Sequence, residues 1–218
     1  MRNTVPHQPP SILVGDDHAM VRRGLRQIVA ETCAGARVEE AGTGQAVIDA
    51  VRRQAWTVVI LDINLPDKNG LEVLKDVKAL RPSLPVLILS HHPEEQYAAR
   101  VYKAGASGYL TKDSAPDELE LALRKVLAGG RYVSPSFAER LAGHLTGEPA
   151  AAPHEALSDR EHLVLCEIAR GKPVSQIADD LALSVKTVST YRARLLEKLQ
   201  LANNAALMRY ALDHRLVE

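Results

Sequence analysis

The chain has 218 residues, of which 27 are Lys or Arg and 27 are Asp or Glu; 46% are hydrophobic and only 4% are aromatic. This length predicts two domains, and the composition predicts aliphatic cores. The net charge is zero, so the overall charge does not indicate nucleic-acid binding. Binding of a nucleic acid would require a local basic surface. The first residues lack an apolar signal core and no segment is long enough to span a bilayer, so we expect a cytoplasmic protein. Cys33 and Cys166 lack metal-like spacing and are expected to be reduced thiols.

Short apolar runs alternate with helical patterns over residues 11–130. The runs predict strands at 11–15, 36–42, 56–62, 84–90 and 106–111, and the patterns predict helices at 18–31, 42–54, 70–80, 93–105 and 115–130. Regular alternation of this kind favours βαβ units, and therefore a doubly wound, five-stranded parallel sheet with helices on both faces. Burial of both faces explains why the strands are continuously apolar.

The pattern changes after Gly130. A short helix is predicted at 134–145, and the Ala- and Pro-rich stretch that follows is interpreted as linker, so residues 131–156 form a linker with a short helix. From 157 onward the chain is predicted to be a small all-α domain of four helices. Their ends carry capping signals, namely Ser158 with Glu161 as a capping box, Gly171 as a stop, Ser184 as an N-cap, and Asn203 or Asn204 as an N-cap.

Polar side chains gather at the carboxyl ends of the predicted strands. These residues are Asp16 and Asp17 after the first strand, Asp62 at the end of the third, Ser90 at the end of the fourth, and Lys112 after the fifth. In open parallel sheets, ligands bind beyond the carboxyl ends of the strands, near the point where strand order reverses. We therefore expect these five side chains to meet at one rim.

This set of side chains predicts phosphoryl chemistry. Clustered carboxylates repel one another and need a cation at neutral pH, and Mg²⁺ is the usual hard ion at a phosphate site. One carboxylate can attack a phosphoryl group to form an aspartyl phosphate, while a lysine ammonium offsets charge on the phosphoryl oxygens. Asp62 ends a fully apolar run, so a rigid strand would hold it as the nucleophile.

The segments "VGDDH", "VVILDINLPDKNG", "ILS" and "GYLTKD" resemble the receiver domain of two-component response regulators, which has a flavodoxin/CheY-like fold. The resemblance covers residues 11–130. It implies that Asp62 is the phosphoacceptor, and that Pro66 and Gly70 belong to the loop after it. The resemblance also assigns the Mg²⁺ site to Asp16, Asp17, Asp62 and the backbone carbonyl of Asn64, and it favours Asp17 over Asp16 as the direct ligand. It assigns the conformational switch to Ser90, Tyr109 and Lys112.

Two other classes of protein with similar folds fit the sequence less well. A haloacid-dehalogenase-type phosphatase needs a second aspartate two residues after its nucleophile, where this chain has Asn64. A flavodoxin-like electron carrier needs a phosphate-binding loop after the first strand, and the acidic "GDDHAM" would repel a phosphate. His91 departs from the receiver pattern. A metal site at His91 and His92 is one interpretation of this pair; we favour the other, that both are loop residues that limit access to Asp62.

Residues 157–214 resemble the helix-turn-helix of LuxR-type regulators, the output domain of the NarL/FixJ group. In the third helix, 184–200, Val188, Leu195 and Leu199 share one face, and four cations at 186, 192, 194 and 198 stand against one acid at 197. Such a helix can enter a major groove. The resemblance places Lys186, Thr187 and Tyr191 toward backbone phosphates and Ser189, Thr190 and Ala193 toward base edges, and Arg194 and Lys198 complete the expected DNA-binding set.

The sequence thus predicts a response regulator with a receiver at 11–130, a linker at 131–156 and a DNA-binding domain at 157–218. Its expected partners are a sensor histidine kinase, double-stranded DNA and, as a further candidate, RNA polymerase, with homodimer formation on phosphorylation. We expect no enzymatic activity beyond the receiver's own phosphorylation and dephosphorylation. The alternative is a phosphate-independent transcription factor whose receiver serves only for docking or dimerisation.

Overall fold

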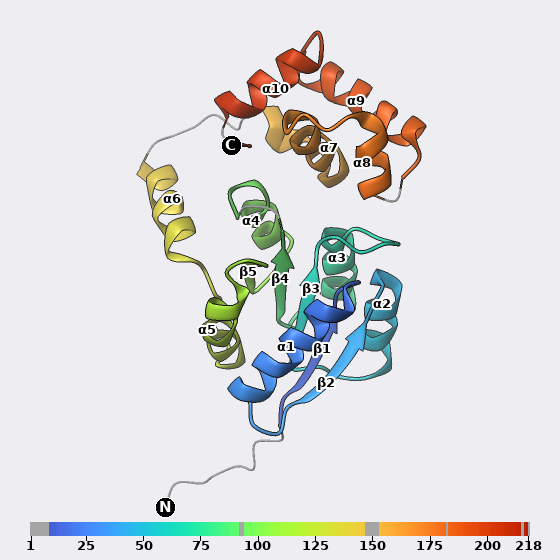
Figure 1. Ribbon diagram of the computed structural model, residues 1–218. Helices are drawn as coiled ribbons and strands as arrows, with labels where there is room; N and C mark the ends of the chain where they lie inside the picture. The colour runs from blue at the N-terminus through green and yellow to red at the C-terminus, as the bar shows by residue number, and fades with distance from the viewer. Residues whose placement is uncertain (1–8, 92–93, 147–152, 182, 215, 218) are drawn as a thin grey trace, which may run out of the picture. The chain divides into compact units, whose positions relative to one another are not determined.

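The computed structural model describes residues 9–91, 94–146, 153–181, 183–214 and 216–217. The chain divides into two compact units (Figure 1). The first runs to Glu94 and continues over Val101–Ser134, and the second contains Glu95–Arg100 with Pro135–Glu218. Within the described residues, the helices are too short or too polar to cross a membrane.

A five-stranded parallel sheet forms the centre of the first unit, in the order β2-β1-β3-β4-β5. The strands are β1 (Ser11–Gly15), β2 (Arg37–Ala41), β3 (Val58–Asp62), β4 (Val86–Ser90) and β5 (Gly108–Thr111). This confirms the predicted doubly wound fold. Strand order reverses between β1 and β3, so the rim beyond the carboxyl ends of these two strands is the expected ligand position.

One helix follows each of these strands along the chain (Figure 1). They are α1 (Ala19–Thr32), α2 (Gly44–Arg53), α3 (Gly70–Leu80), α4 (Glu94–Lys103) and α5 (Ala115–Leu127). Helices α1 and α5 pack together on one face of the sheet, where Leu25, Val29, Leu119 and Leu123 join a buried aliphatic core with the strands. The second predicted helix began at residue 42, but Thr43 caps α2 through its side chain and so sets the start at Gly44.

The segment after α5 remains attached to the first unit. The backbone N–H of Tyr132 donates to Ser107 O over 2.8 Å, and its hydroxyl donates to Glu118 over 2.7 Å. The hydroxyl of Tyr102 donates to the Tyr132 carbonyl over 2.7 Å. Because the Tyr132 side chain is also part of the aliphatic core, residues Arg131–Ser134 are held at the edge of the sheet.

The second unit is helical. Its elements are α6 (Pro135–Thr146), the 3₁₀ turn η1 (Pro153–Ala156), α7 (Asp159–Ala169), α8 (Val174–Asp180), α9 (Val185–Lys198) and α10 (Asn204–Asp213). The short helix predicted at 134–145 is present as α6, whereas part of the predicted linker, residues 147–152, lies outside the described residues. Ser158 and Glu161 form the predicted capping box, Ser184 caps α9, and Asn203 caps α10. These caps fix where α7, α9 and α10 begin.

Candidate functional site

Four side chains, from the turn between β1 and α1 and from the end of β3, gather at the rim of the first unit. Their ligand atoms, from Asp16, Asp17, His18 and Asp62, all lie within 4.8 Å of one another. Adjacent pairing of β1 with β3 brings the first and third strand ends together. Asp16 and Asp62 are each 1% exposed, whereas Asp17 faces solvent. The structure therefore brings the three predicted carboxylates together.

Lys112 lies between two of these carboxylates. Its Nζ is 2.7 Å from Asp16 Oδ2 and 2.7 Å from Asp62 Oδ2, and its side chain is only 5% exposed. The Lys112 backbone N–H donates to the Ser90 carbonyl over 2.7 Å, which ties β5 to the end of β4 at this point. Burial lowers the pKa of Lys112, but its bonds to the two carboxylates outweigh that effect and raise the pKa overall. Lys112 is thus a fixed positive charge inside the cluster.

The Asp62 carboxylate is buried, and burial disfavours its charged form. Burial raises its pKa, and the nearby Asp16 charge adds to the increase, against the opposing bonds from Lys112 and the Asn64 N–H. A single ammonium among three carboxylates leaves excess negative charge. A divalent cation would offset that charge, so the cluster fits a metal ion with hard oxygen ligands.

The loop after β3 is fixed by backbone geometry around Gly70. A Cβ at this position would lie 2.1 Å from the Asp62 carbonyl oxygen, which only glycine avoids. The close approach lets the Gly70 N–H donate to Ile63 O over 2.7 Å, while the Asn64 N–H donates to Asp62 Oδ1 over 3.1 Å. Asp67 accepts from the N–H groups at the start of α2, over 2.7 and 2.9 Å. The loop therefore holds the Asp62 carboxylate in one orientation.

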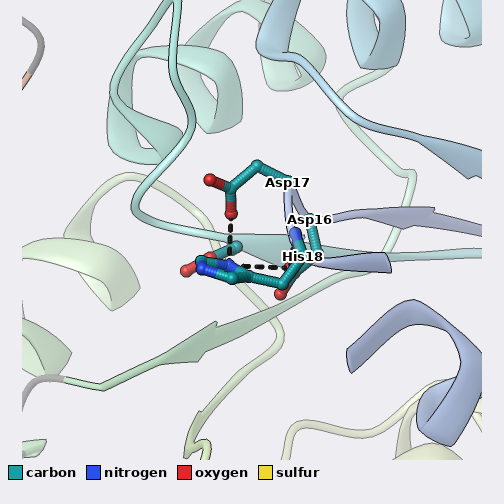
Figure 2. A group of neighbouring side chains, drawn as sticks. Asp16, Asp17 and His18 are labelled. Carbon is teal, nitrogen blue, oxygen red and sulfur yellow. Dashed lines mark hydrogen bonds and ion pairs between the residues drawn. The ribbon is translucent and has the colours of Figure 1, made fainter. Parts of the chain in front are cut away.

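His18 is part of the cluster, although the sequence reasoning did not select it. Figure 2 shows its ring beside the two acids that precede it. His18 Nδ1 is 2.6 Å from Asp17 Oδ1 and 3.6 Å from Asp16 Oδ1. Its position directly after the acid pair was the available signal, but adjacent residues do not normally share a direction, so the contact depends on the turn into α1.

The predicted switch residues are buried within the sheet. Ser90 is 0% exposed at the end of β4, and Tyr109 is 1% exposed on β5. These strands are neighbours, with Ser90 opposite Thr111 in the register. His91, which follows Ser90, is exposed, and His92 lies outside the described residues. Any movement of Ser90 and Tyr109 therefore requires repacking of the interior.

In the second unit, α9 presents one apolar face and one polar face. Val188, Leu195 and Leu199 are buried in the helical core. The exposed residues of this helix include Lys186, Ser189, Thr190, Ala193 and Arg194. A surface hollow is lined by Lys186, Thr187, Thr190, Tyr191 and Arg194. Most of the predicted DNA-contacting residues therefore share one accessible surface.

Two cations of α9 are engaged inside the second unit. Lys198 Nζ lies 2.7 Å from Glu161, and Arg192 bonds to Asn204 at the start of α10. Glu161 is buried, which raises its pKa, but the bonds from Lys198 and Ser158 outweigh burial and lower it overall. Lys198 therefore joins α9 to α7, in addition to any role in a DNA contact.

Two family models match the chain. The model for the response regulator receiver domain matches residues 12–124, and the model for bacterial regulatory proteins of the luxR family matches residues 155–211. The two matches coincide with the strand-end cluster and with the helical surface of α9, respectively.

Curated relatives cover nearly the whole chain. Response regulator UvrY of Escherichia coli K12 is 34% identical over 94% of this chain and 95% of its own. Response regulator GacA of Pseudomonas aeruginosa is 34% identical over 95% of this chain and 97% of its own. Among solved structures, RcsB of Salmonella enterica serovar Typhimurium, bound to a promoter in the presence of the phosphomimetic BeF₃⁻, has a TM-score of 0.62 and 27% identity, covering 92% of this chain and 98% of that chain.

Proposed function

The chain belongs to the NarL/FixJ family of two-component response regulators, with a receiver domain and a DNA-binding LuxR-type helix-turn-helix, and on this premise we propose that a sensor histidine kinase transfers a phosphoryl group to Asp62. One observation carries the assignment: the buried Asp62 carboxylate contacts Lys112 at the rim of the sheet, beside two further acids. This arrangement combines a nucleophile with an excess of negative charge that a metal ion can offset.

The residues around Asp62 have distinct parts in the transfer. An Asp62 carboxylate oxygen attacks phosphorus, and the bond from phosphorus to the kinase's phosphodonor nitrogen breaks. Asp16, Asp17, Asp62 and the Asn64 backbone carbonyl would hold Mg²⁺, which supplies positive charge to the phosphoryl oxygens when bound. Lys112 moves from its carboxylate partners toward the new phosphoryl group. The Ser90 hydroxyl then donates to a phosphoryl oxygen, and Tyr109 fills the space that Ser90 leaves.

We assign the DNA contact to the exposed surface of α9. Lys186, Thr187 and Tyr191 would meet backbone phosphates, and Ser189, Thr190 and Ala193 would face base edges. This division is the one that the resemblance to LuxR-type regulators implies, and the exposure of the polar face of α9 supports it. Arg194 extends the same surface, whereas Lys198 contributes charge while bonded to Glu161. As a transcription regulator, the protein would act in the cytoplasm.

Lys186→Ala is expected to weaken binding to all DNA sequences and to make the slope of log K against log salt shallower by about one unit, because one phosphate contact and its released counterion are lost. The measurement is a DNA titration at several salt concentrations. Arg209→Ala removes a similarly exposed cation, on α10, and serves as the matched control with an unchanged slope. A change confined to sequence preference would contradict the orientation assigned to α9.

Phosphorylation is expected to shift the full-length protein toward a dimer and to tighten its specific DNA binding, because two linked helix-turn-helix domains gain from effective concentration. The test compares sedimentation and DNA titration with and without BeF₃⁻, the phosphomimetic present in the RcsB–promoter structure. Asp62→Asn protein treated in the same way is the control. Equal mass and equal affinity in both states would favour the alternative, a phosphate-independent regulator that uses its receiver only for docking.

A further inference from the structure

We propose that Nδ1 of His18 is a ligand of the metal ion held at Asp17, and that this nitrogen makes the site select a transition ion such as Mn²⁺ over Mg²⁺. The inference rests on the metal site of the proposed function and adds a residue that determines its selectivity. The acids explain why a divalent cation binds, but hard carboxylate ligands alone discriminate weakly between Mg²⁺ and Mn²⁺.

The positions of three ligand atoms support this role. His18 Nδ1 lies 2.6 Å from Asp17 Oδ1 and 3.6 Å from Asp16 Oδ1 (Figure 2). In an octahedral site with bonds of about 2.1 Å, neighbouring ligand atoms are roughly 3 Å apart. The spacing of the nitrogen from the two oxygens brackets that value, so the three atoms are placed as neighbours around one ion.

The backbone directs the His18 side chain toward the acids. His18 is the N-cap residue of α1, with extended backbone angles, but its ring does not bond to the helix N-terminus. Its N–H instead donates to Asp16 Oδ1 over 2.7 Å, and Arg22 donates to the Asp16 carbonyl over 2.8 Å. These bonds fix the turn between β1 and α1. The ring is therefore held beside Asp17 by the turn rather than by helix capping.

The chemistry of imidazole decides which ion gains from this contact. A neutral ring with its hydrogen on Nε2 presents a lone pair at Nδ1, and a side chain that is 60% exposed lets Nε2 donate to water. Nitrogen ligands favour the first-row transition ions, whereas Mg²⁺ prefers oxygen and keeps several waters. His18 can thus replace a water on Mn²⁺ and leave Mg²⁺ nearly unaffected.

The test measures equilibrium binding of the two ions to the full-length protein. Free Mn²⁺ is followed by electron paramagnetic resonance, and Mg²⁺ affinity is obtained by competition against Mn²⁺. His18→Ala is expected to weaken Mn²⁺ binding about tenfold and to change Mg²⁺ affinity by less than about twofold. His214→Ala, at an exposed histidine of the second unit, is the matched control and should bind both ions like the parent protein.

Three results would overturn the inference: an unchanged Mn²⁺ affinity, an equal loss for both ions, or tighter binding of both, which would make His18 a competitor of the metal. His18→Asn keeps a polar side chain at the same turn and should reproduce the loss of Mn²⁺ preference, so a folding defect of the alanine variant cannot imitate the result. Asp17→Asn separates the two proposals. If it binds both ions like the parent protein, the acidic metal site itself is wrong, whereas loss of binding together with a silent His18→Ala refutes only the role of His18.

Discussion

Asp62→Asn is expected to abolish Mg²⁺-dependent incorporation of phosphate from acetyl phosphate, because the amide cannot act as the nucleophile. The variant should remain folded, since burial already raises the pKa of Asp62 and its anion is not a source of stability. The measurement is intact-protein mass spectrometry after incubation with the phosphodonor and Mg²⁺, with unfolding curves recorded in parallel.

Asp49→Asn is the matched control for this experiment. Asp49 lies on α2, and its exposed carboxylate pairs with Arg52. It is accessible and acidic but has no place in the cluster or in the loop after Asp62, so its asparagine variant should incorporate phosphate like the parent protein. Undiminished labelling of Asp62→Asn would show that another residue is the acceptor.

Lys112→Ala is expected to lower the free energy of unfolding of the metal-free protein by about 3–5 kcal/mol, the range for removing one partner of a buried ion pair. Asp16 and Asp62, each 2.7 Å from the ammonium, would be left as neighbouring buried anions. Saturating Mg²⁺ should restore part of the loss, since the ion binds the folded state alone. The single tryptophan, Trp56, is buried in the receiver, so urea unfolding can be followed by its fluorescence.

The pH dependence of the stability loss tests the role of Lys112 in a second, independent way. The pKa of Asp62 is raised in the folded state, so its anion opposes folding at neutral pH and protonation as the pH falls relieves that opposition. Removing Lys112 raises this pKa further, so the stability deficit of Lys112→Ala should shrink toward acidic pH. Lys68→Ala breaks a partly exposed ion pair with Asp76 and should cost less than about 1 kcal/mol. If Lys112→Ala also lowered the free energy of unfolding by less than about 1 kcal/mol, the proposal that Lys112 stabilises two buried carboxylates would be contradicted.

The sheet and most helix ends could be predicted because local signals determine them. Continuous apolar runs marked β1, β3 and β4, whereas the edge strand β2 carries charged residues. The side chains of Ser158, Ser184 and Asn203 marked three helix starts. The meeting of Asp16 with Asp62 followed from parallel topology alone, since carboxyl ends of parallel strands share one rim.

Side-chain pairing between distant parts of the chain could not be predicted. Charge counting placed Lys198 among the four cations of its helix, but it cannot reveal Glu161, which lies 37 residues earlier and accepts from Lys198. His18 was overlooked for a related reason. Its contact with Asp17 depends on the backbone angles of one turn, and sequence patterns report the presence of a turn rather than the direction of each ring.

Tyr132 determines where one receiver can be exchanged for another by recombination. A cut directly after Gly130 would remove a ring that is 2% exposed and take away the hydroxyl bound to Glu118. It would also separate Ser134 from its bond to Glu94. A transplanted receiver must therefore carry its own residues through Ser134, and a foreign output domain can be grafted from Pro135, the first residue of α6, without opening the receiver's interior.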